Sequence, residues 1–255
     1  SLKDNGHLLK DTKGIPVVSC LHNFHFMVDN EVPVETFVSL DAGEVTIEEI
    51  SEGGLHSHEY YVEATKNHTL CAFVGSHPKL LEMWKGKILF FNCPVPDQVY
   101  MDESAKIEDF SVWMTSGGNV LGACTYLAKG ILGGNPIAWV GANYAFDYKK
   151  KFHGWDSKYD KNIGQCLRAQ DVYGHKVLTW QSYFNFKNWN EWLVCTVPGI
   201  YFNCTEGGIL GAYSEGNIAQ IKQMDLSAFI RMYSLHEEMQ KQCMDPKAGE
   251  KKILF

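Results

Sequence analysis

The sequence predicts one α/β domain with an open, mostly parallel sheet and helices on both faces. Short apolar segments alternate along the chain with amphipathic segments, which is the order of strands and helices in such a fold. The strand candidates are almost continuously apolar, as expected for strands that are covered on both faces. With 255 residues and 45% hydrophobic residues, the chain is long enough to bury a large core.

The strand candidates are short apolar runs bounded by polar, Gly or Pro residues. In chain order they are residues 15–20, 36–41, 69–75, 87–93, 111–115, 136–141, 175–180 and 200–204. Between them, four segments are predicted to be helical: residues 77–84, 119–131, 162–172 and 186–196. A further helix is expected in the tail, where apolar residues fall on one helical face and Asp225 or Ser227 is available as the N-cap. These apolar residues are Leu226, Phe229, Ile230, Tyr233 and Leu235.

Charge and composition narrow the classes of function. The formal net charge is −7, with 23 Lys and Arg against 30 Asp and Glu. This balance argues against nucleic acid as the main partner, because such binding depends on clustered basic residues. A local basic pocket for a nucleotide phosphate remains compatible with it. No apolar stretch is as long as a membrane span, and neither repeats nor Pro/Gly linkers divide the chain, so residues 1–255 are expected to form a single domain without a membrane span.

The cysteines indicate a reducing compartment. The chain has eight of them, and no two form a C-x-x-C pair. Most lie inside apolar runs such as VVSC and LFFNC, where a free Cys behaves as a small hydrophobic residue. We therefore expect a reduced, cytoplasmic protein rather than a disulfide framework.

A glycine-rich turn follows the strand candidate at 111–115. Ser116, Gly117 and Gly118 stand between this strand and a long helix. A glycine pair at such a turn lets the backbone approach a ligand, and the helix N-terminus offers N–H donors and positive potential to a phosphate. The segment is neither a Walker A motif nor G-x-G-x-x-G, so a plain tight turn is an equal alternative.

Polar residues also follow three other strand candidates. Asp41 ends one of them, where it is suited to a metal, a ribose hydroxyl or a local cap. Asn143 and His153 lie in the long segment after residues 136–141, and His153 is either a general acid/base or a solvated loop residue. Thr205 and Glu206 stand directly before two glycines after residues 200–204. Ligands in open α/β sheets bind outside the carboxyl ends of the strands, so these positions are the candidate site.

The residues predict no metal centre. His56, His58 and Glu59 are close together in GGLHSHEYY, but their spacing is not a zinc pattern and no further ligand is indicated. No cofactor is therefore expected from the motifs themselves.

Taken together, the strand-end segments resemble the MptE-like family, which includes the bacterial flagellar motility accessory factor (Maf) glycosyltransferases and the archaeal 6-hydroxymethylpterin pyrophosphokinases. SLKDN at the start resembles the end of the family's G-x-G-P-S-L turn. This likeness implies that Ser1 faces the nucleotide, and that the first strand and its glycine-rich turn precede residue 1. The resemblance runs over nearly the whole chain.

The resemblance also assigns the remaining candidate residues. VPVETFVSLDAG places Asp41 at the family's conspicuous acid, and TSGGNVLGACTYLAKGILGG resembles its Gly-rich turn and helix. YFNCTEGG resembles the late I-N-x-T-E-G-G turn with Thr205 and Glu206, and His153 matches a downstream histidine. One departure is Asn143, because the family usually has an aspartate there, and Asn keeps hydrogen bonding but loses the charge.

A more distant likeness is to bacterial CMP-sialic-acid-dependent sialyltransferases. HNFHF is similar to their N-x-F-x-F segment, which implies that Asn23 contacts the nucleotide and that the fold is Rossmann-like and sialyltransferase-like. Those enzymes work without a metal, which fits Asn143, and the likeness makes His153 the candidate base.

The function implied by these resemblances is a nucleotide-dependent transferase, a glycosyltransferase that uses a CMP-activated nonulosonic (sialic-like) sugar. The expected partners are a nucleotide or nucleotide-sugar and an acceptor that the sequence does not identify. Two alternatives remain open: a 6-hydroxymethylpterin pyrophosphokinase that uses ATP and Mg²⁺ with Asp41 as the metal anchor, and a nucleotide-binding module without catalysis.

Overall fold

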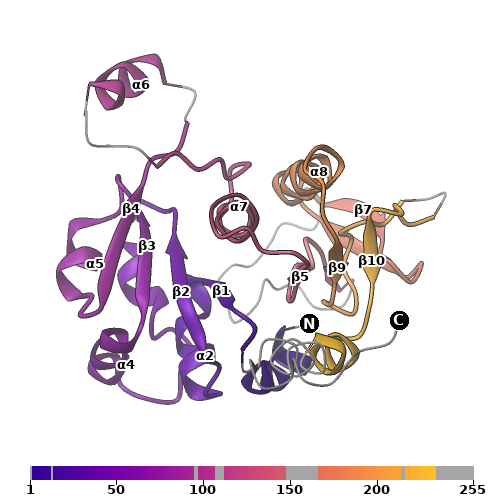
Figure 1. Cartoon of the computed structure of the whole chain (residues 1–255), viewed down its shortest axis with the longest axis horizontal. Helices are drawn as coiled ribbons and strands as arrows, with labels where there is room; N and C mark the ends of the chain where they lie inside the picture. The colour runs from indigo at the N-terminus through magenta and orange to yellow at the C-terminus, as the bar shows by residue number, and fades with distance from the viewer. Residues whose placement is uncertain are drawn as a thin grey trace, which may run out of the picture.

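A four-stranded parallel sheet forms one half of the molecule. The computed structural model describes residues 2–12, 14–94, 97–106, 112–147, 166–213 and 216–233, without the side chains of Lys3 and Ala105. The first sheet has the order β1-β2-β3-β4, and every neighbouring pair is parallel (Figure 1). Its strands are β1 Val17–Cys20, β2 Val34–Ser39, β3 Thr69–Phe73 and β4 Lys87–Phe91.

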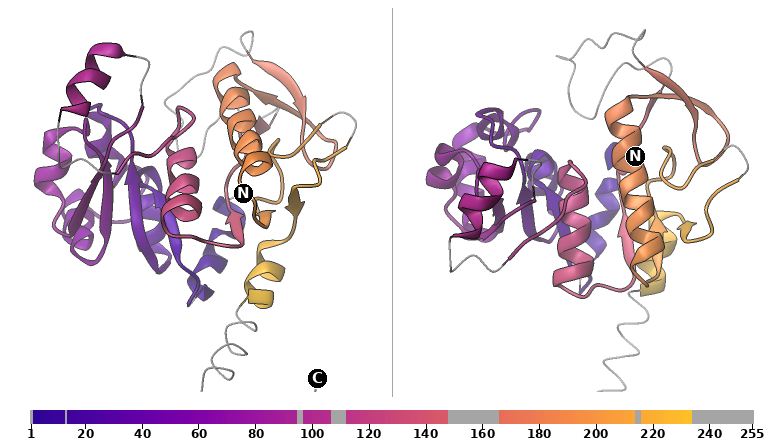
Figure 2. Two further views of the ribbon diagram at one scale, coloured as in Figure 1. Left: turned by 45° about the horizontal axis from the view of Figure 1, so that its top comes forward. Right: turned by 90° about the horizontal axis from the view of Figure 1, so that it is seen from above.

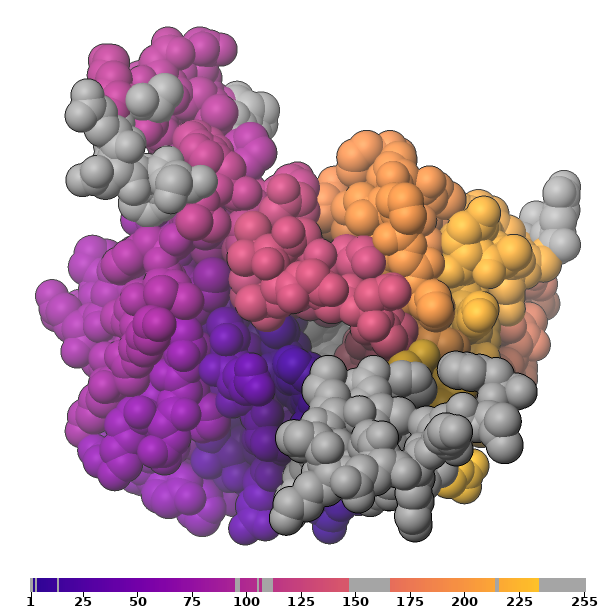
Figure 3. Space-filling model, viewed as in Figure 1, coloured from indigo at the N-terminus to yellow at the C-terminus, as the bar shows by residue number. Residues whose placement is uncertain are grey.

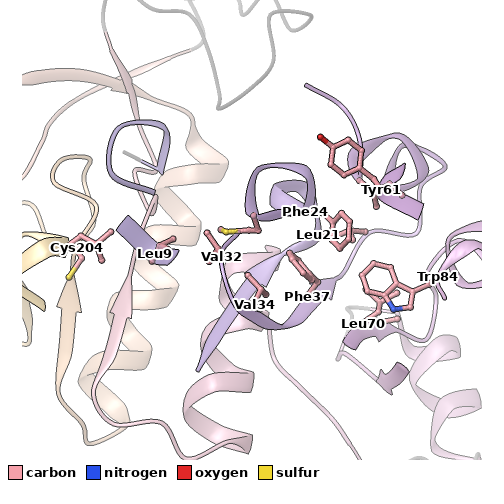
Figure 4. Close-up of a cluster of buried hydrophobic side chains, with 14 of the residues drawn as sticks. Leu9, Leu21, Phe24, Val32, Val34, Phe37, Tyr61, Leu70, Trp84 and Cys204 are labelled. Atoms are coloured by element: carbon pink, nitrogen blue, oxygen red, sulfur yellow. The ribbon is translucent and has the colours of Figure 1, made fainter. Parts of the chain in front are cut away.

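Alternate side chains of this sheet enter two different cores, because successive residues of a strand point to opposite faces. Phe37 and Leu70 pack on one face against α2 (Phe24–Asp29), α4 (His58–Ala64) and α5 (Pro78–Met83) (Figure 4). The neighbouring residues Val38 and Cys71 pack on the other face against α7 (Val120–Tyr126). Both faces of the sheet are therefore covered by helices, which explains the continuously apolar strands and confirms the predicted α/β class.

A second parallel sheet contains the later strands, in the order β10-β9-β5. These strands are β5 Ile137–Trp139, β9 Tyr201–Asn203 and β10 Ile221–Gln223. Helix α7 contacts both sheets: Cys124 Sγ lies 3.8 Å from Cys20 Sγ of β1, and Trp139 Nε1 of β5 donates to Thr125 Oγ1 at 2.9 Å. Figures 1 and 2 show α7 between the two halves and beside α8 (Gln181–Thr196), and Figure 3 shows the same segment connecting their surfaces. The parallel strands thus form two sheets instead of the one open sheet that was predicted.

The third sheet is antiparallel, with the order β6-β8-β7. Its strands are β6 Phe146–Asp147, β7 Leu167–Gln170 and β8 Lys176–Thr179. The helix predicted over residues 162–172 is therefore wrong in its described part. A turn decides this, because Asp171 Oδ1 accepts from the N–H groups of Tyr173 and His175 and Gly174 adopts φ 85°, which closes a β7–β8 hairpin.

The remaining predicted elements fall largely where expected. The candidates at 77–84, 119–131 and 186–196 are helical, and residues 226–233 form the expected tail helix. The strand expected at 111–115 is reduced to an isolated parallel bridge between Asn92 and Trp113. The other helical segments are α1 Leu2–Asn5, η1 Gly6–Asp11, η2 Leu21–Asn23, α3 Val45–Glu49, η3 Thr65–Asn67, α6 Gln98–Ala105 and the π-helical continuation of α7, η4 Leu127–Ile131.

One hydrophobic cluster joins the two halves. Leu9 of η1 packs in the same buried cluster as Phe37 of the first sheet and Phe202 of the second (Figure 4 labels Leu9, Phe37 and Cys204). Phe229 of the tail helix also enters it, with its ring centroid 5.4 Å from that of Phe202. Among the helices that the structure describes, none is long and apolar enough to cross a membrane.

Candidate functional site

A cavity of about 360 Å³ lies at the carboxyl edge of the first sheet. Its walls come from residues at or just beyond the ends of β2, β3 and β4, together with the glycine-rich turn that precedes α7. These lining residues are Leu40, Phe73, Cys93, Pro94, Thr115, Ser116, Gly117 and Gly118. We call this the edge cavity. It occupies the position at which open α/β sheets bind ligands, and its volume lies in the range of small-molecule sites, about 300–1,000 Å³.

The turn at the edge cavity is held by its own hydrogen bonds. The buried Ser116 Oγ accepts from the Gly118 N–H at 3.1 Å, and its carbonyl accepts from the Asn119 N–H at 3.3 Å. Gly117 and Gly118 have φ values of 60° and 83°, in the left-handed region that favours glycine. The Gly117 N–H donates to no acceptor among the described residues. That amide is therefore available to a ligand in the cavity.

The glycine at 117 has a packing role as well. A Cβ built there would lie 2.2 Å from the Trp189 ring of α8, so a side chain has no space on that side of the turn. Gly122, one helical turn later, is equally constrained, since its Cβ would lie 1.9 Å from the Ser116 carbonyl oxygen. The glycine-rich turn thus packs closely against α8, and the same turn lines the edge cavity.

Helix α7 begins directly after the turn. Asn119 is its N-cap, and the Asn119 Oδ1 accepts from the Gly122 N–H at 2.9 Å. The cap uses one of the helix's unpaired N–H groups and fixes the direction of the helix relative to the cavity. The positive end of the helix dipole consequently lies beside Ser116–Gly118.

Helix α6 contributes an aromatic side chain to the rim. Tyr100 donates a hydrogen bond from its hydroxyl to Asn92 Oδ1, and its ring lies 6.3 Å from that of Phe73, which lines the cavity. In Figure 1, α6 otherwise stands apart from the body of the molecule. Tyr100 therefore anchors α6 at the mouth of the edge cavity.

Asp41 follows Leu40, a wall residue of the cavity. Its side chain is exposed, and Asp41 Oδ1 accepts from the Gly43 N–H at 2.7 Å. This Asx-type contact is the local cap that the sequence left as one alternative. The second carboxylate oxygen has no partner among the described residues, so Asp41 combines a turn-forming role with a free acceptor near the cavity.

Asn143, Thr205 and Glu206 come together at a different place, beyond the carboxyl ends of β5 and β9. Thr205 Oγ1 accepts from the Ala142 N–H at 2.9 Å, and the Asn143 carbonyl accepts from the Ile209 N–H at 2.9 Å. Glu206 has φ 58°, and its Oε1 accepts from the Leu226 N–H at 3.1 Å at the start of the tail helix. None of the three is among the residues that line the edge cavity, so a shared site for all candidates stays a prediction.

The CTEGG turn closes onto the chain after β5. A Cβ at Gly208 would lie 2.4 Å from the Asn143 carbonyl oxygen, which explains the glycine. Tyr144, in the segment after β5, lies near the thiols of Cys20 at the end of β1 and Cys124 of α7. Burial, followed by these two thiols, raises the pKa of its hydroxyl. The segment after β5 therefore lies beside the carboxyl end of β1.

The remaining candidates are placed as follows. Asn23 is half-buried at the junction of η2 and α2, just after β1, and it does not line the edge cavity. Ser1 and His153 lie outside the described residues. The structure adds Phe73, Cys93 and Tyr100 to the surroundings of the cavity. Cys93 ends the strand predicted at 87–93 and Phe73 lies close to the end of the strand predicted at 69–75, so position near a strand end was the signal for these two. No sequence signal pointed to Tyr100.

The described residues contain no cluster of three or more His, Cys, Asp or Glu side chains suited to a metal. His58 Nδ1 lies 2.9 Å from Ser51 Oγ, while His56 Nε2 lies 3.8 Å from Asp29 Oδ1, so the two histidines of GGLHSHEYY turn to different partners. The cysteines in the described ranges are free thiols.

Among solved structures, the chain is similar to the MAf glycosyltransferase from Magnetospirillum magneticum AMB-1, with a TM-score of 0.60 and 12% sequence identity. The match covers 98% of this chain and 37% of that protein, so the chain spans little more than a third of its length. No protein-family model and no curated protein matches the chain. At this level of identity the similarity shows the fold, a Rossmann-like α/β arrangement of the type seen in that glycosyltransferase.

Proposed function

We propose that the chain is the nucleotide-sugar-binding part of a glycosyltransferase, and that its donor is a CMP-activated nonulosonic sugar. The observation that carries the proposal is the edge cavity, which lies at the carboxyl ends of parallel strands and includes a glycine turn and a helix N-terminus. The similarity to the MAf glycosyltransferase over 98% of the chain supports the class of enzyme. The sequence resemblance to the MptE-like family points in the same direction.

The walls of the edge cavity suit the parts of a nucleotide. Leu40, Phe73 and Pro94 supply an apolar wall for the base. Thr115 and Ser116 supply hydroxyls on the opposite chain segment, and the Gly117 amide supplies a donor for a phosphate oxygen at the positive end of α7. This division between an apolar wall and few polar groups is typical of small-molecule sites.

The charge of the cavity favours a nucleoside monophosphate over a triphosphate. No Lys or Arg occurs among its lining residues in the described part of the chain. A triphosphate carries several negative charges, which proteins usually neutralise with basic side chains or Mg²⁺. CMP, with a single phosphate, requires less compensation, and this ranks the CMP-sugar donor above the ATP- and Mg²⁺-dependent pyrophosphokinase.

The proposed reaction transfers the sugar to an acceptor hydroxyl. The acceptor oxygen forms a bond to the anomeric carbon, the bond between this carbon and the phosphate oxygen breaks, and CMP leaves with the bonding electrons. The acceptor proton passes to a general base, for which we propose His153, since an imidazole with an ordinary pKa of about 6.5 suits neutral pH. Asp41, which directly follows the wall residue Leu40 and has one carboxylate oxygen without a partner among the described residues, is the alternative for the same role.

A ligand panel tests the proposal. Thermal unfolding is measured with CMP, CDP, ATP and GTP, each with and without Mg²⁺. We expect CMP to stabilise the protein most and without Mg²⁺, by about 2.7 kcal/mol when its concentration is 100 times Kd. Stabilisation by ATP only with Mg²⁺ would favour the pyrophosphokinase instead.

A blocking variant locates the binding. Thr115→Trp fills the edge cavity and should abolish the CMP shift, whereas Thr196→Trp, at the exposed end of α8, should retain it. An undiminished CMP shift in Thr115→Trp would place the nucleotide elsewhere.

A further inference from the structure

A second and larger cavity lies on the other side of α8. It has a volume of about 600 Å³ and is enclosed by the β7–β8 hairpin, α8 and the segment after the CTEGG turn. Its lining residues are Arg168, Ala169, Gln170, Lys176, Val177, Phe184, Lys187, Ile209, Ala212 and Tyr213. We call this the hairpin cavity.

Helix geometry separates the two cavities. On α8, Phe186 and Trp189 face the glycine-rich turn, where they restrict Gly118 and Gly117. Phe184 and Lys187 lie on the opposite side of the same helix, since successive residues of an α-helix are rotated by about 100°. A ligand in the hairpin cavity therefore does not share the glycine turn.

Lys187 lines the hairpin cavity, and its ammonium group is buried. Lys187 is only 1% exposed, and its Nζ donates to Glu191 Oε2 at 2.9 Å. The same Nζ lies 4.1 Å from the ring centroid of Tyr213 and 5.3 Å from that of Phe184. An ammonium has three N–H donors, and Glu191 is the one hydrogen-bonding partner of Lys187 in the described chain. The rings of Tyr213 and Phe184 face the ammonium, and its remaining N–H donors have no oxygen or nitrogen acceptor among the described residues.

Both carboxylate oxygens of Glu191 already accept hydrogen bonds. Its Oε1 accepts from the Gly211 N–H at 2.7 Å, and its Oε2 accepts from the Tyr213 hydroxyl at 2.5 Å as well as from Lys187. The carboxylate thus fixes Lys187 in place and orders the wall of the cavity. A buried charge with unfilled donors is costly unless another acceptor is supplied.

The rim adds two more cations. Arg168 and Lys176 line the cavity from the hairpin, both are exposed, and neither forms an ion pair with a residue that the structure describes. No acidic residue occurs among the described lining residues. The floor, in contrast, is apolar: Val177, Ile209 and Ala212 belong to one hydrophobic cluster together with Phe184. The described lining therefore combines an apolar floor with two rim cations that have no ion-pair partner among the described residues.

We propose that the hairpin cavity is a second ligand site, which binds a small anionic molecule with an apolar body. The phosphate or carboxylate accepts from Arg168 and Lys176 at the rim and is attracted by the buried ammonium of Lys187, while the apolar body packs on the floor. This site lies outside the nucleotide site of the proposed function and does not depend on it.

Matched probes of one size test the site. Phenyl phosphate and benzoate carry the two anionic groups on the same ring, and benzyl alcohol is the neutral counterpart. Binding is measured by isothermal titration calorimetry at low and at high NaCl. We expect phenyl phosphate or benzoate to bind, benzyl alcohol to bind at least 10-fold more weakly, and the anion affinity to fall with salt. The stronger of the two anions identifies the group that the site prefers. Equal binding of all three, or of none, would overturn the proposal.

Rim variants assign the binding to this cavity without disturbing the core. The double variant Arg168→Gln/Lys176→Gln should weaken the anion at least 10-fold while its melting temperature stays close to that of the parent. Lys66→Gln/Lys79→Gln, a control with the same loss of two positive charges at exposed positions on the first half, should bind as the parent does. An unchanged affinity in the rim variant, or a loss of the anion in Thr115→Trp at the edge cavity, would contradict the assignment.

Discussion

Gly117 provides the sharpest test of how the glycine-rich turn is built. The perturbation is Gly117→Ala, which adds a single methyl group at a residue with φ 60°. Two penalties are expected. The left-handed conformation of an L-residue costs about 1–2 kcal/mol, and the added Cβ lies 2.2 Å from the Trp189 ring, an overpacking that typically costs about 1–3 kcal/mol. Together they predict a destabilisation of about 2–5 kcal/mol.

Gly133→Ala is the matched control. Gly133 has φ 70°, but a Cβ there would meet nothing within 4 Å, so only the conformational penalty of about 1–2 kcal/mol applies. The change in the unfolded chain is the same for both substitutions and cancels in the comparison. The difference between the two variants therefore measures the contact between the turn and α8.

The assay is urea unfolding under reducing conditions, followed by far-UV circular dichroism. We expect the free energy of unfolding to be lower in Gly117→Ala than in Gly133→Ala by about 1–3 kcal/mol. A second step adds Trp189→Ala, which removes the clashing ring, so the two substitutions should be less destabilising together than their separate effects predict. Equal destabilisation at positions 117 and 133 would refute the packing of the turn on Trp189.

Three further predictions concern other parts of the structure. Lys187→Met should lower the free energy of unfolding by about 3–5 kcal/mol, because it leaves Glu191 buried without its cation. Adding Glu191→Gln should recover part of this loss. Both effects are measured by urea unfolding, and a Lys187→Met variant as stable as the parent would refute the buried pair. Asn119→Ala should lower the free energy of unfolding by about 0.5–2 kcal/mol in the same assay, because α7 loses its N-cap, and Asn119→Asp should lower it less. Equal decreases in the two variants would show that the cap contributes nothing. Hydrogen bonds from Lys66 and then Lys85 lower the pKa of Glu63 from 4.5 to about 2, so its contribution to stability is present above pH 4.5 and is lost as the pH falls towards 2. The stability difference between the parent and Glu63→Gln should accordingly become much smaller over that pH interval, and a difference as large at pH 2 as at pH 7 would contradict the assignment.

Much of the fold was predictable because it depends on local patterns. The strand candidates at 36–41 and 69–75 were visible as apolar runs, and the structure explains the pattern: Phe37 and Val38 enter different cores on the two faces of one sheet. The β7–β8 hairpin was missed because Leu167–Gln170 is only four residues long and contains no β-branched or aromatic residue, and its turn is fixed by the side chain of Asp171 rather than by a standard two-residue motif.

The candidate site was predictable only in part. Ser116–Gly118 line the edge cavity, since their position follows directly from the strand-to-helix order. Thr205 and Glu206 were grouped with them on the same argument, but the second sheet directs that turn onto Asn143 and the tail helix. Sequence order does not show which strands share a sheet, so it could not separate the two groups.

The hairpin cavity was not predictable at all. Lys187 and Glu191 are four residues apart on a helix, a spacing that usually indicates a solvated ion pair. Their burial arises from the packing of the hairpin and of residues 209–213 over α8, a long-range arrangement that no local motif records.

A crystal structure of the protein with CMP would show directly whether the edge cavity binds the nucleotide. We expect the CMP phosphate within hydrogen-bonding distance of the Gly117 N–H and the base against Phe73. Density for CMP in the hairpin cavity, or at any place other than the turn at residues 116–118, would contradict it.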